Sequence, residues 1–66
     1  MFQEKVLALA NVVMSSGVKN EVVNGSLFCE GCTVEEAVKL ESAILDLFSV
    51  GVILSRFGNT SAFDFV

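Results

Sequence analysis

Two cysteines separated by two residues stand near the middle of the chain, in the segment Cys29-Glu30-Gly31-Cys32. Paired thiols at this spacing can exchange a disulfide or supply two ligands to a zinc ion. The pair follows a segment predicted as a strand and precedes a predicted helix. These residues are therefore the first candidates for chemistry in a chain that contains no histidine.

This arrangement resembles the redox motif of thioredoxin-like proteins, over four residues of the chain. In that family the first sulfur lies near a helix N-terminus, where exposed amides and the helix dipole stabilise the thiolate. Here Thr33 is the predicted N-cap, so Cys29 precedes the helix by almost a full turn, and nearby glutamates such as Glu30 would raise a thiol pKa. The chain also has no proline, whereas a cis-proline faces the cysteines in that family.

Metal binding is a second interpretation of the pair. A structural zinc site needs four ligands, usually cysteine or histidine, so a site built on Cys29 and Cys32 would have to be shared between two subunits. We interpret the pair first as structural, because free cysteine behaves as a small buried hydrophobe. A thiol–disulfide site and a shared metal site or inter-subunit disulfide remain the alternatives.

Other catalytic arrangements are missing from the sequence. Without histidine the usual general base near neutral pH is absent. Glu35 and Glu36 are adjacent, but neighbouring helical positions do not face each other. Gly25 and Gly31 do not form a phosphate-binding loop. The sequence therefore predicts a protein that is not an enzyme and has no cofactor.

The elements that would hold these residues occur twice. Gly17 is echoed 34 positions later by Gly51 and, with one residue of slippage, Phe28 is echoed by Phe63. Each half predicts a helix ended by glycine and then two strands around an Asn/Gly turn. The chain is therefore predicted as one α+β domain over residues 1–66, with repeats at about 1–31 and 32–66 and an α-β-β-α-β-β order that packs two helices on one antiparallel sheet.

Periodicity and capping signals set the predicted bounds. Apolar residues at helical spacing predict a first helix over 2–16. Thr33 with Glu36 forms a capping box that begins a second helix, which runs to about Val50. The predicted core face of this helix comprises Ala37, Leu40, Ile44, Leu47 and Phe48.

Hydrophobic residues make up 53% of this short chain. A domain of this mass exposes roughly 4,100 Å² when folded and buries only about 60% of its unfolded surface, so we expect self-association, most simply a homodimer. The first helix is apolar on more than one side, and Leu7, Ala10 and Met14 are its predicted oligomer contacts.

The chain has a net charge of −4, and its four cationic residues are scattered along the sequence. They are too few for a phosphate-binding stripe, so direct nucleic-acid binding is not expected. Acidic residues gather on the second helix, and Glu35, Glu41 and Asp46 are the predicted docking face for a basic partner. The alternative interpretation is a solvated helix face.

No apolar run approaches the roughly 20 residues of a membrane span. Val6 to Met14 resembles a signal-peptide core, but Gln3 and Glu4 replace the basic leader, so a cytoplasmic location is expected.

Together these observations predict a small acidic, non-catalytic, homo-oligomeric protein that binds another, unidentified protein and modulates or blocks it, of the kind common among viral and mobile-element accessory proteins. The thiol–disulfide or shared-metal protein is the first alternative. A small-molecule binder with its pocket between subunits is the second.

Overall fold

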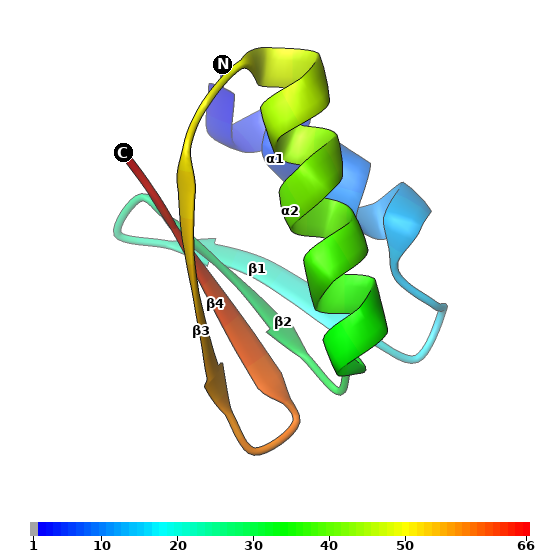
Figure 1. Cartoon of the computed structure of the whole chain (residues 1–66). Helices are drawn as coiled ribbons and strands as arrows, with labels where there is room; N and C mark the ends of the chain where they lie inside the picture. The colour runs from blue at the N-terminus through cyan, green and yellow to red at the C-terminus, as the bar shows by residue number, and fades with distance from the viewer. Residues whose placement is uncertain (1) are drawn as a thin grey trace.

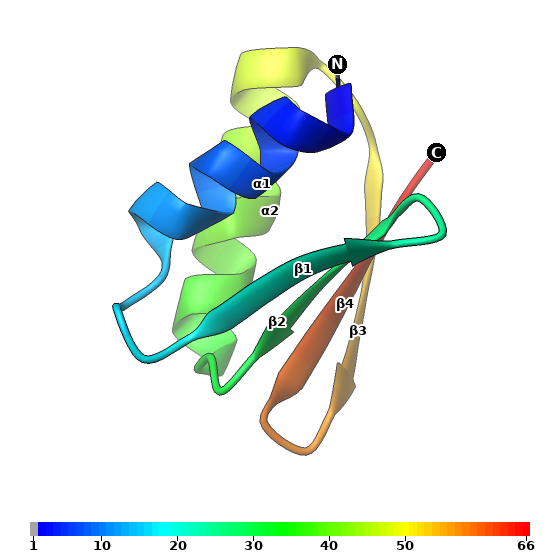
Figure 2. The same ribbon diagram turned by 180° about the vertical axis from the view of Figure 1, so that it is seen from behind.

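A computed structural model describes residues 2–66 of the chain. Its elements are α1 (Phe2–Val13), β1 (Lys19–Val23), β2 (Ser26–Glu30), α2 (Val34–Phe48), β3 (Val52–Phe57) and β4 (Thr60–Phe65). The strands form one antiparallel sheet in the order β1-β2-β4-β3, and both helices cover the same face of it (Figures 1 and 2). The predicted α+β fold with its α-β-β-α-β-β order is confirmed.

The two halves of the chain correspond at a constant offset of 34 residues. The hairpin turns are Asn24-Gly25 and Gly58-Asn59, so the turns themselves keep this offset. The predicted slippage of one residue is therefore wrong. Phe28 pairs with Ala62, its own equivalent, across the central β2–β4 ladder, and an approximate two-fold axis passes through this pair.

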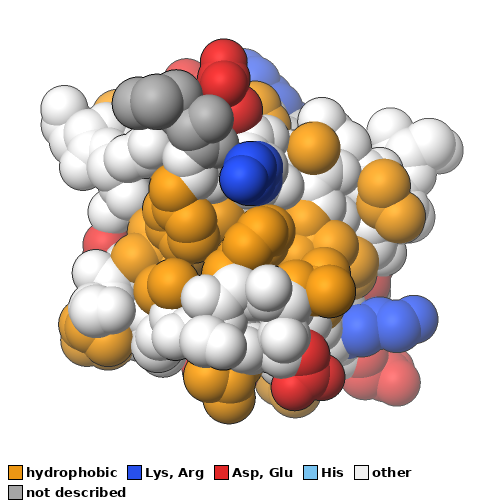
Figure 3. Space-filling model, turned by 90° about the horizontal axis from the view of Figure 1, so that it is seen from above, with side chains coloured by type: hydrophobic (Ala, Val, Ile, Leu, Met, Phe, Trp, Pro, Cys, Tyr) orange, Lys and Arg blue, Asp and Glu red, His pale blue; other side chains and the backbone are white. Residues whose placement is uncertain are grey.

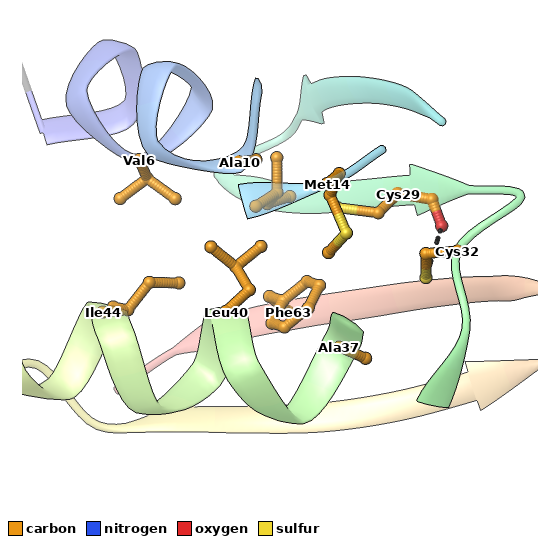
Figure 4. Close-up of a cluster of buried hydrophobic side chains, with 10 residues drawn as sticks. Val6, Ala10, Met14, Cys29, Cys32, Ala37, Leu40, Ile44 and Phe63 are labelled. Atoms are coloured by element: carbon orange, nitrogen blue, oxygen red, sulfur yellow. Dashed lines mark hydrogen bonds between the residues drawn. The ribbon is translucent and has the colours of Figure 1, made fainter. Parts of the chain in front are cut away.

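The core lies between the helices and the covered face of the sheet. Val6 and Ala10 of α1 and their equivalents on α2, Leu40 and Ile44, are fully buried. They meet over Phe63 of β4, as Figure 4 shows. Buried positions four residues apart on each helix give the single apolar stripe that a two-layer structure requires.

The helix ends differ from the glycine-terminated ends predicted above. Neither Gly17 nor Gly51 has a positive φ. The left-handed C-cap of α2 is Ser49, with φ 55°, and α1 ends at Val13. Leu47, predicted to face the core, is instead 66% exposed.

The N-terminus of α2 agrees with the sequence. Thr33 Oγ1 accepts a hydrogen bond from the Glu36 amide, and the Glu36 carboxylate accepts one from the Thr33 amide, so the predicted capping box is confirmed. Within residues 2–66, no helix is long and apolar enough to cross a membrane.

Candidate functional site

Cys29 and Cys32 flank the turn that joins β2 to α2. Cys29 is the fourth residue of β2 and is fully buried, and Cys32 precedes the N-cap and is 3% exposed. Gly31, between them, has φ 91°, a conformation that other residues adopt only with strain. This turn brings Cys32 back over the sheet, where its thiol lies 3.4 Å from the Cys29 carbonyl oxygen (Figure 4).

Two residues that the sequence analysis did not single out, Ser61 and Arg56, complete a cluster with the cysteines. Cys29 pairs with Ser61 and Ser61 pairs with Arg56, so the three lie in one row across β2, β4 and β3. The Cys32 thiol lies 3.1 Å from Ser61 Oγ. Arg56 Nη1 donates to Ser61 Oγ at 3.0 Å and to the Cys32 carbonyl oxygen at 2.9 Å, and it lies 3.3 Å from Cys32 Sγ.

The electrostatics around Cys29 oppose thiolate chemistry at that residue. Burial, with smaller contributions from Cys32 and Glu36, raises the pKa of the Cys29 thiol to about 12. At neutral pH Cys29 is therefore a protonated thiol, and a protonated thiol is a poor nucleophile and a poor metal ligand. The environment of Cys29 favours the structural interpretation over the redox one.

The position of the pair also opposes a metal site shared between subunits. Both side chains are buried within the chain, so a second copy cannot reach them without opening the core. Within residues 2–66, no group of three or more His, Cys, Asp or Glu side chains is placed to hold a metal ion.

The acidic residues predicted to form one docking face lie on two sides of α2. Glu35 and Asp46 are exposed, whereas Glu41 is half-buried. At 3.6 residues per turn, Glu35 and Asp46 share one side of the helix and Glu41 lies about a third of a turn from it. A partner docked on Glu35 and Asp46 would thus meet Glu41 only at its margin.

Glu36 links the two helices rather than facing a partner. Its Oε2 accepts a hydrogen bond of 2.8 Å from the backbone amide of Ser15, just beyond the end of α1. Hydrogen bonds from the Thr33 and Ser15 amides hold the pKa of Glu36 below its ordinary value. The carboxylate therefore stabilises both the start of α2 and the position of α1.

The predicted oligomer contacts on α1 lie largely inside the chain. Ala10 is fully buried and Met14 is 5% exposed, while Leu7 is half-buried. Their spacing places them on the side of α1 that meets the core rather than on its outer side. A second copy that touched α1 would instead meet residues such as Val12, which is 81% exposed.

The face of the sheet opposite the helices carries exposed apolar side chains. Ile53 is 54% exposed, Phe57 67% and Val23 40%. The strand registers place them on the same face as the central pair Phe28 and Ala62. We call this surface, formed by alternate residues of all four strands, the open face. Its members are Lys19, Glu21, Val23, Ser26, Phe28, Glu30, Ile53, Ser55, Phe57, Thr60, Ala62 and Asp64.

The charge of the open face is mostly negative. It holds three acids, Glu21, Glu30 and Asp64, against Lys19, which lies opposite Glu30 in the β1–β2 ladder. The Asp64 carboxylate accepts a hydrogen bond from the Ser26 hydroxyl across the strands. An apolar centre with an acidic surround fits a partner surface that is apolar and basic.

A second apolar region covers the end of the molecule where the two termini lie. The ring of Phe2 packs edge-on against Phe48 and Phe65, at centroid distances of 5.7 and 5.1 Å. Seen from above, hydrophobic side chains gather across the middle of this surface (Figure 3). Val66, the last residue, is 77% exposed.

No ligand-sized pocket opens among residues 2–66. In comparisons with known proteins, the chain matches no protein-family model, no curated protein and no solved structure. The functional interpretation therefore depends on the surfaces and the buried cluster described above.

Proposed function

We propose that this chain is a small, acidic, non-catalytic binding protein that self-associates and binds another protein, whose activity it modulates or blocks. The observation that carries the proposal is the open face. An antiparallel sheet that faces water on one side normally alternates apolar and polar residues, with the polar residues outward. Here Phe28, Ile53 and Phe57 point outward from the sheet.

Apolar patches of this kind on a small protein mark contact surfaces. Phenylalanine is among the residues enriched at the centres of interfaces, and charged residues are concentrated at the rims. On the open face Phe28 lies at the centre, while Glu21 and Glu30 lie toward the β1 side. This distribution supports docking by a partner with an apolar centre and basic side chains around it.

The experiment that tests this function is affinity capture with a matched surface variant. The unaltered chain serves as one bait, and the other is a double variant on the β1 side of the open face, Glu21→Lys with Val23→Lys. Both residues are exposed, so the variant should keep its far-ultraviolet circular dichroism. We expect mass spectrometry to identify one host protein that the unaltered bait enriches and the variant loses, and purified partner should bind with an affinity that falls as salt rises.

The acidic side of α2 supplies the control. Glu35→Lys with Asp46→Lys reverses two exposed charges on the opposite layer of the molecule and should leave capture unchanged. If this variant loses the partner while the open-face variant retains it, the docking surface is α2. If the open-face variant and the α2 variant both capture every protein as well as the unaltered chain does, the binding proposal fails for both surfaces.

A further inference from the structure

The two edge strands of the sheet differ in the side chains that they carry on the open face. Lys19, Glu21 and Val23 of β1 correspond, at the offset of 34 residues, to Ile53, Ser55 and Phe57 of β3. Edge strands usually carry charges, because their unpaired N–H and C=O groups would otherwise recruit another strand. The β1 edge is protected in this way, and the equivalent positions of β3 are uncharged.

The one charged residue of β3 does not protect its edge. The side chain of Arg56 lies on the helix-covered face of the sheet, where its guanidinium donates to the carbonyl oxygens of Cys32 and Gly58 at 2.9 and 3.0 Å. It also donates to Ser61 Oγ on β4. These hydrogen bonds hold the guanidinium group of Arg56 against its own chain. The positive charge therefore does not extend beyond β3, where it could repel an approaching strand.

The two helices differ as the edge strands do: the second half of the chain carries apolar residues where the first half carries polar ones. Val38 and Leu45 of α2 correspond to Glu4 and Asn11 of α1, and they are 47% and 56% exposed. They lie about half of the helix circumference away from Glu36, whose carboxylate is bonded to Ser15 beside α1. Val38 and Leu45 therefore face away from α1, on the side where β3 forms the edge of the sheet.

We propose that a second copy of this chain docks along the β3 edge. The β3 strands of the two copies run antiparallel and join two four-stranded sheets into one continuous sheet, and the Val38–Leu45 flanks of the two α2 helices face each other above the junction. This inference builds on the self-association in the proposed function. It differs from it in naming the surface and the occupant.

A second copy fits this surface better than an unrelated strand does. The occupant must supply a free β edge and, on the same side of it, an apolar helix flank, and a two-fold axis makes each copy supply both to the other. Both copies carry a net charge of −4, yet β3 has no acidic residue. The junction therefore joins two acidic molecules where the strands bring no carboxylates together.

The hairpin fixes which groups of β3 are free to pair. Phe57 and Thr60 close a two-residue turn, so Phe57, Ser55 and Ile53 direct their N–H and C=O groups toward β4. Val52, Leu54 and Arg56 direct theirs outward. In the proposed register Leu54 of one copy pairs with Arg56 of the other, Ser55 lies opposite Ser55, and Ile53 meets Phe57 on the open face.

A stable dimer would cover a substantial part of the surface of this chain. A standard interface buries about 800 Å² on each partner, about a fifth of the 3971 Å² that one chain exposes. The edge of the six-residue strand β3, the outward side chains of Ile53 and Phe57, and the flank of α2 supply the backbone groups and apolar side chains for such a contact. The dimer also doubles the open face, so both partner-binding surfaces lie on the same side of one sheet.

Cross-linking of single-cysteine variants tests the register. Ser55→Cys places a thiol opposite its own copy in a non-hydrogen-bonded pair, where the Cα atoms are close enough for a disulfide. The matched control is Glu21→Cys, the equivalent position on β1. The native cysteines are buried and do not compete. Under air oxidation we expect Ser55→Cys to migrate as a covalent dimer on a non-reducing gel and Glu21→Cys to remain a monomer.

A second variant tests the helix flank. Val38→Glu with Leu45→Asn gives α2 the residues that α1 carries at the equivalent positions, and it should convert the dimer to a monomer of unchanged circular dichroism. Val12→Asn, a change at an even more exposed valine on α1, should leave the dimer intact. A dimer that fails to cross-link through Ser55→Cys, or that survives the α2 variant, overturns the β3 junction while leaving self-association standing. A monomer at every concentration overturns both the β3 junction and self-association. This outcome does not depend on the result of the partner capture described above.

Discussion

Arg56 Nη1 donates a hydrogen bond of 2.9 Å to the carbonyl oxygen of Cys32, 24 positions away in the sequence. The bond ties the edge strand β3 to the turn that precedes α2. On the other side of α2, the Glu36 carboxylate accepts a hydrogen bond from the Ser15 amide. The start of α2 is therefore held from both sides by charged side chains that bond to backbone groups.

The first prediction concerns Arg56. Arg56→Lys retains the charge but loses the planar fork that reaches Cys32, Ser61 and Gly58 together. Hydrogen bonds to charged groups contribute roughly 1.5–3 kcal/mol each, and partial exposure places this site at the lower end, so we expect a loss of about 1–2 kcal/mol in the free energy of unfolding. Urea denaturation measures it. Lys39→Arg, on the exposed side of α2, should change stability by less than about 0.5 kcal/mol.

The second prediction separates the two cysteines. Replacing Cys29 with serine puts a hydroxyl in a fully buried position where no hydrogen bond to the thiol is seen within residues 2–66, and should cost about 1–3 kcal/mol. Cys32→Ser should cost less than about 1 kcal/mol, because Ser61, Arg56 and the Cys29 carbonyl remain as partners. Equal losses in denaturation experiments would contradict this assignment. So would stoichiometric zinc in the purified protein.

The third prediction is a pH dependence due to Glu36. Its pKa is lowered in the folded state by the Thr33 and Ser15 amides, so its contribution to stability is complete above the ordinary pKa of a glutamate. That contribution is lost as the pH falls through the ordinary value toward the lowered one. Thermal melts from neutral pH downward should therefore show a loss of stability in this acid range. In the Glu36→Gln variant this pH-dependent loss should be smaller.

The control for this measurement is the adjacent Glu35→Gln. Glu35 lies in the same first turn of α2 but is exposed and takes no part in the capping box. The Glu35→Gln variant should lose as much stability in the acid range as the unaltered chain does. If the two variants have the same pH profile, the hydrogen bonds from the Thr33 and Ser15 amides to Glu36 do not contribute to stability in solution.

The fourth prediction concerns Ser49, the left-handed C-cap of α2. A non-glycine residue in this conformation carries a strain of roughly 1–2 kcal/mol. Glycine removes this strain, but it loses more conformational entropy on folding, which offsets part of the gain. Ser49→Gly should therefore stabilise the protein by about 0.5–1 kcal/mol. Ser15→Gly is the matched change at the equivalent position, where φ is not positive, and it should not stabilise. A destabilised Ser49→Gly would show that its hydroxyl matters more than its backbone.

Much of the fold could be predicted because its signals are local. The helices follow from apolar spacing, and the start of α2 follows from Thr33 and Glu36. The helix ends could not be located by glycine, because Ser49 takes the left-handed conformation two residues before Gly51. The echo of Phe28 by Phe63 misplaced the register by one residue, and in a strand one residue changes the face of the sheet.

The buried cluster could be predicted only in part. The Cys29–Cys32 spacing identified the turn, but Arg56 and Ser61 join it through strand pairing between distant segments. Once the register is known, Cys29, Ser61 and Arg56 fall in one row. The open face was hidden for the same reason: Phe28, Ile53 and Phe57 were assigned to strands, and only the register shows that they share the uncovered side.

The central claim is that the apolar surface left exposed by one chain is covered by protein contacts, first of all by a second copy. Sedimentation equilibrium of the unaltered chain across micromolar concentrations tests it most directly. The account predicts a mass of twice 7.1 kDa that falls toward 7.1 kDa only on dilution. A mass of 7.1 kDa at every concentration, with native circular dichroism, would contradict it.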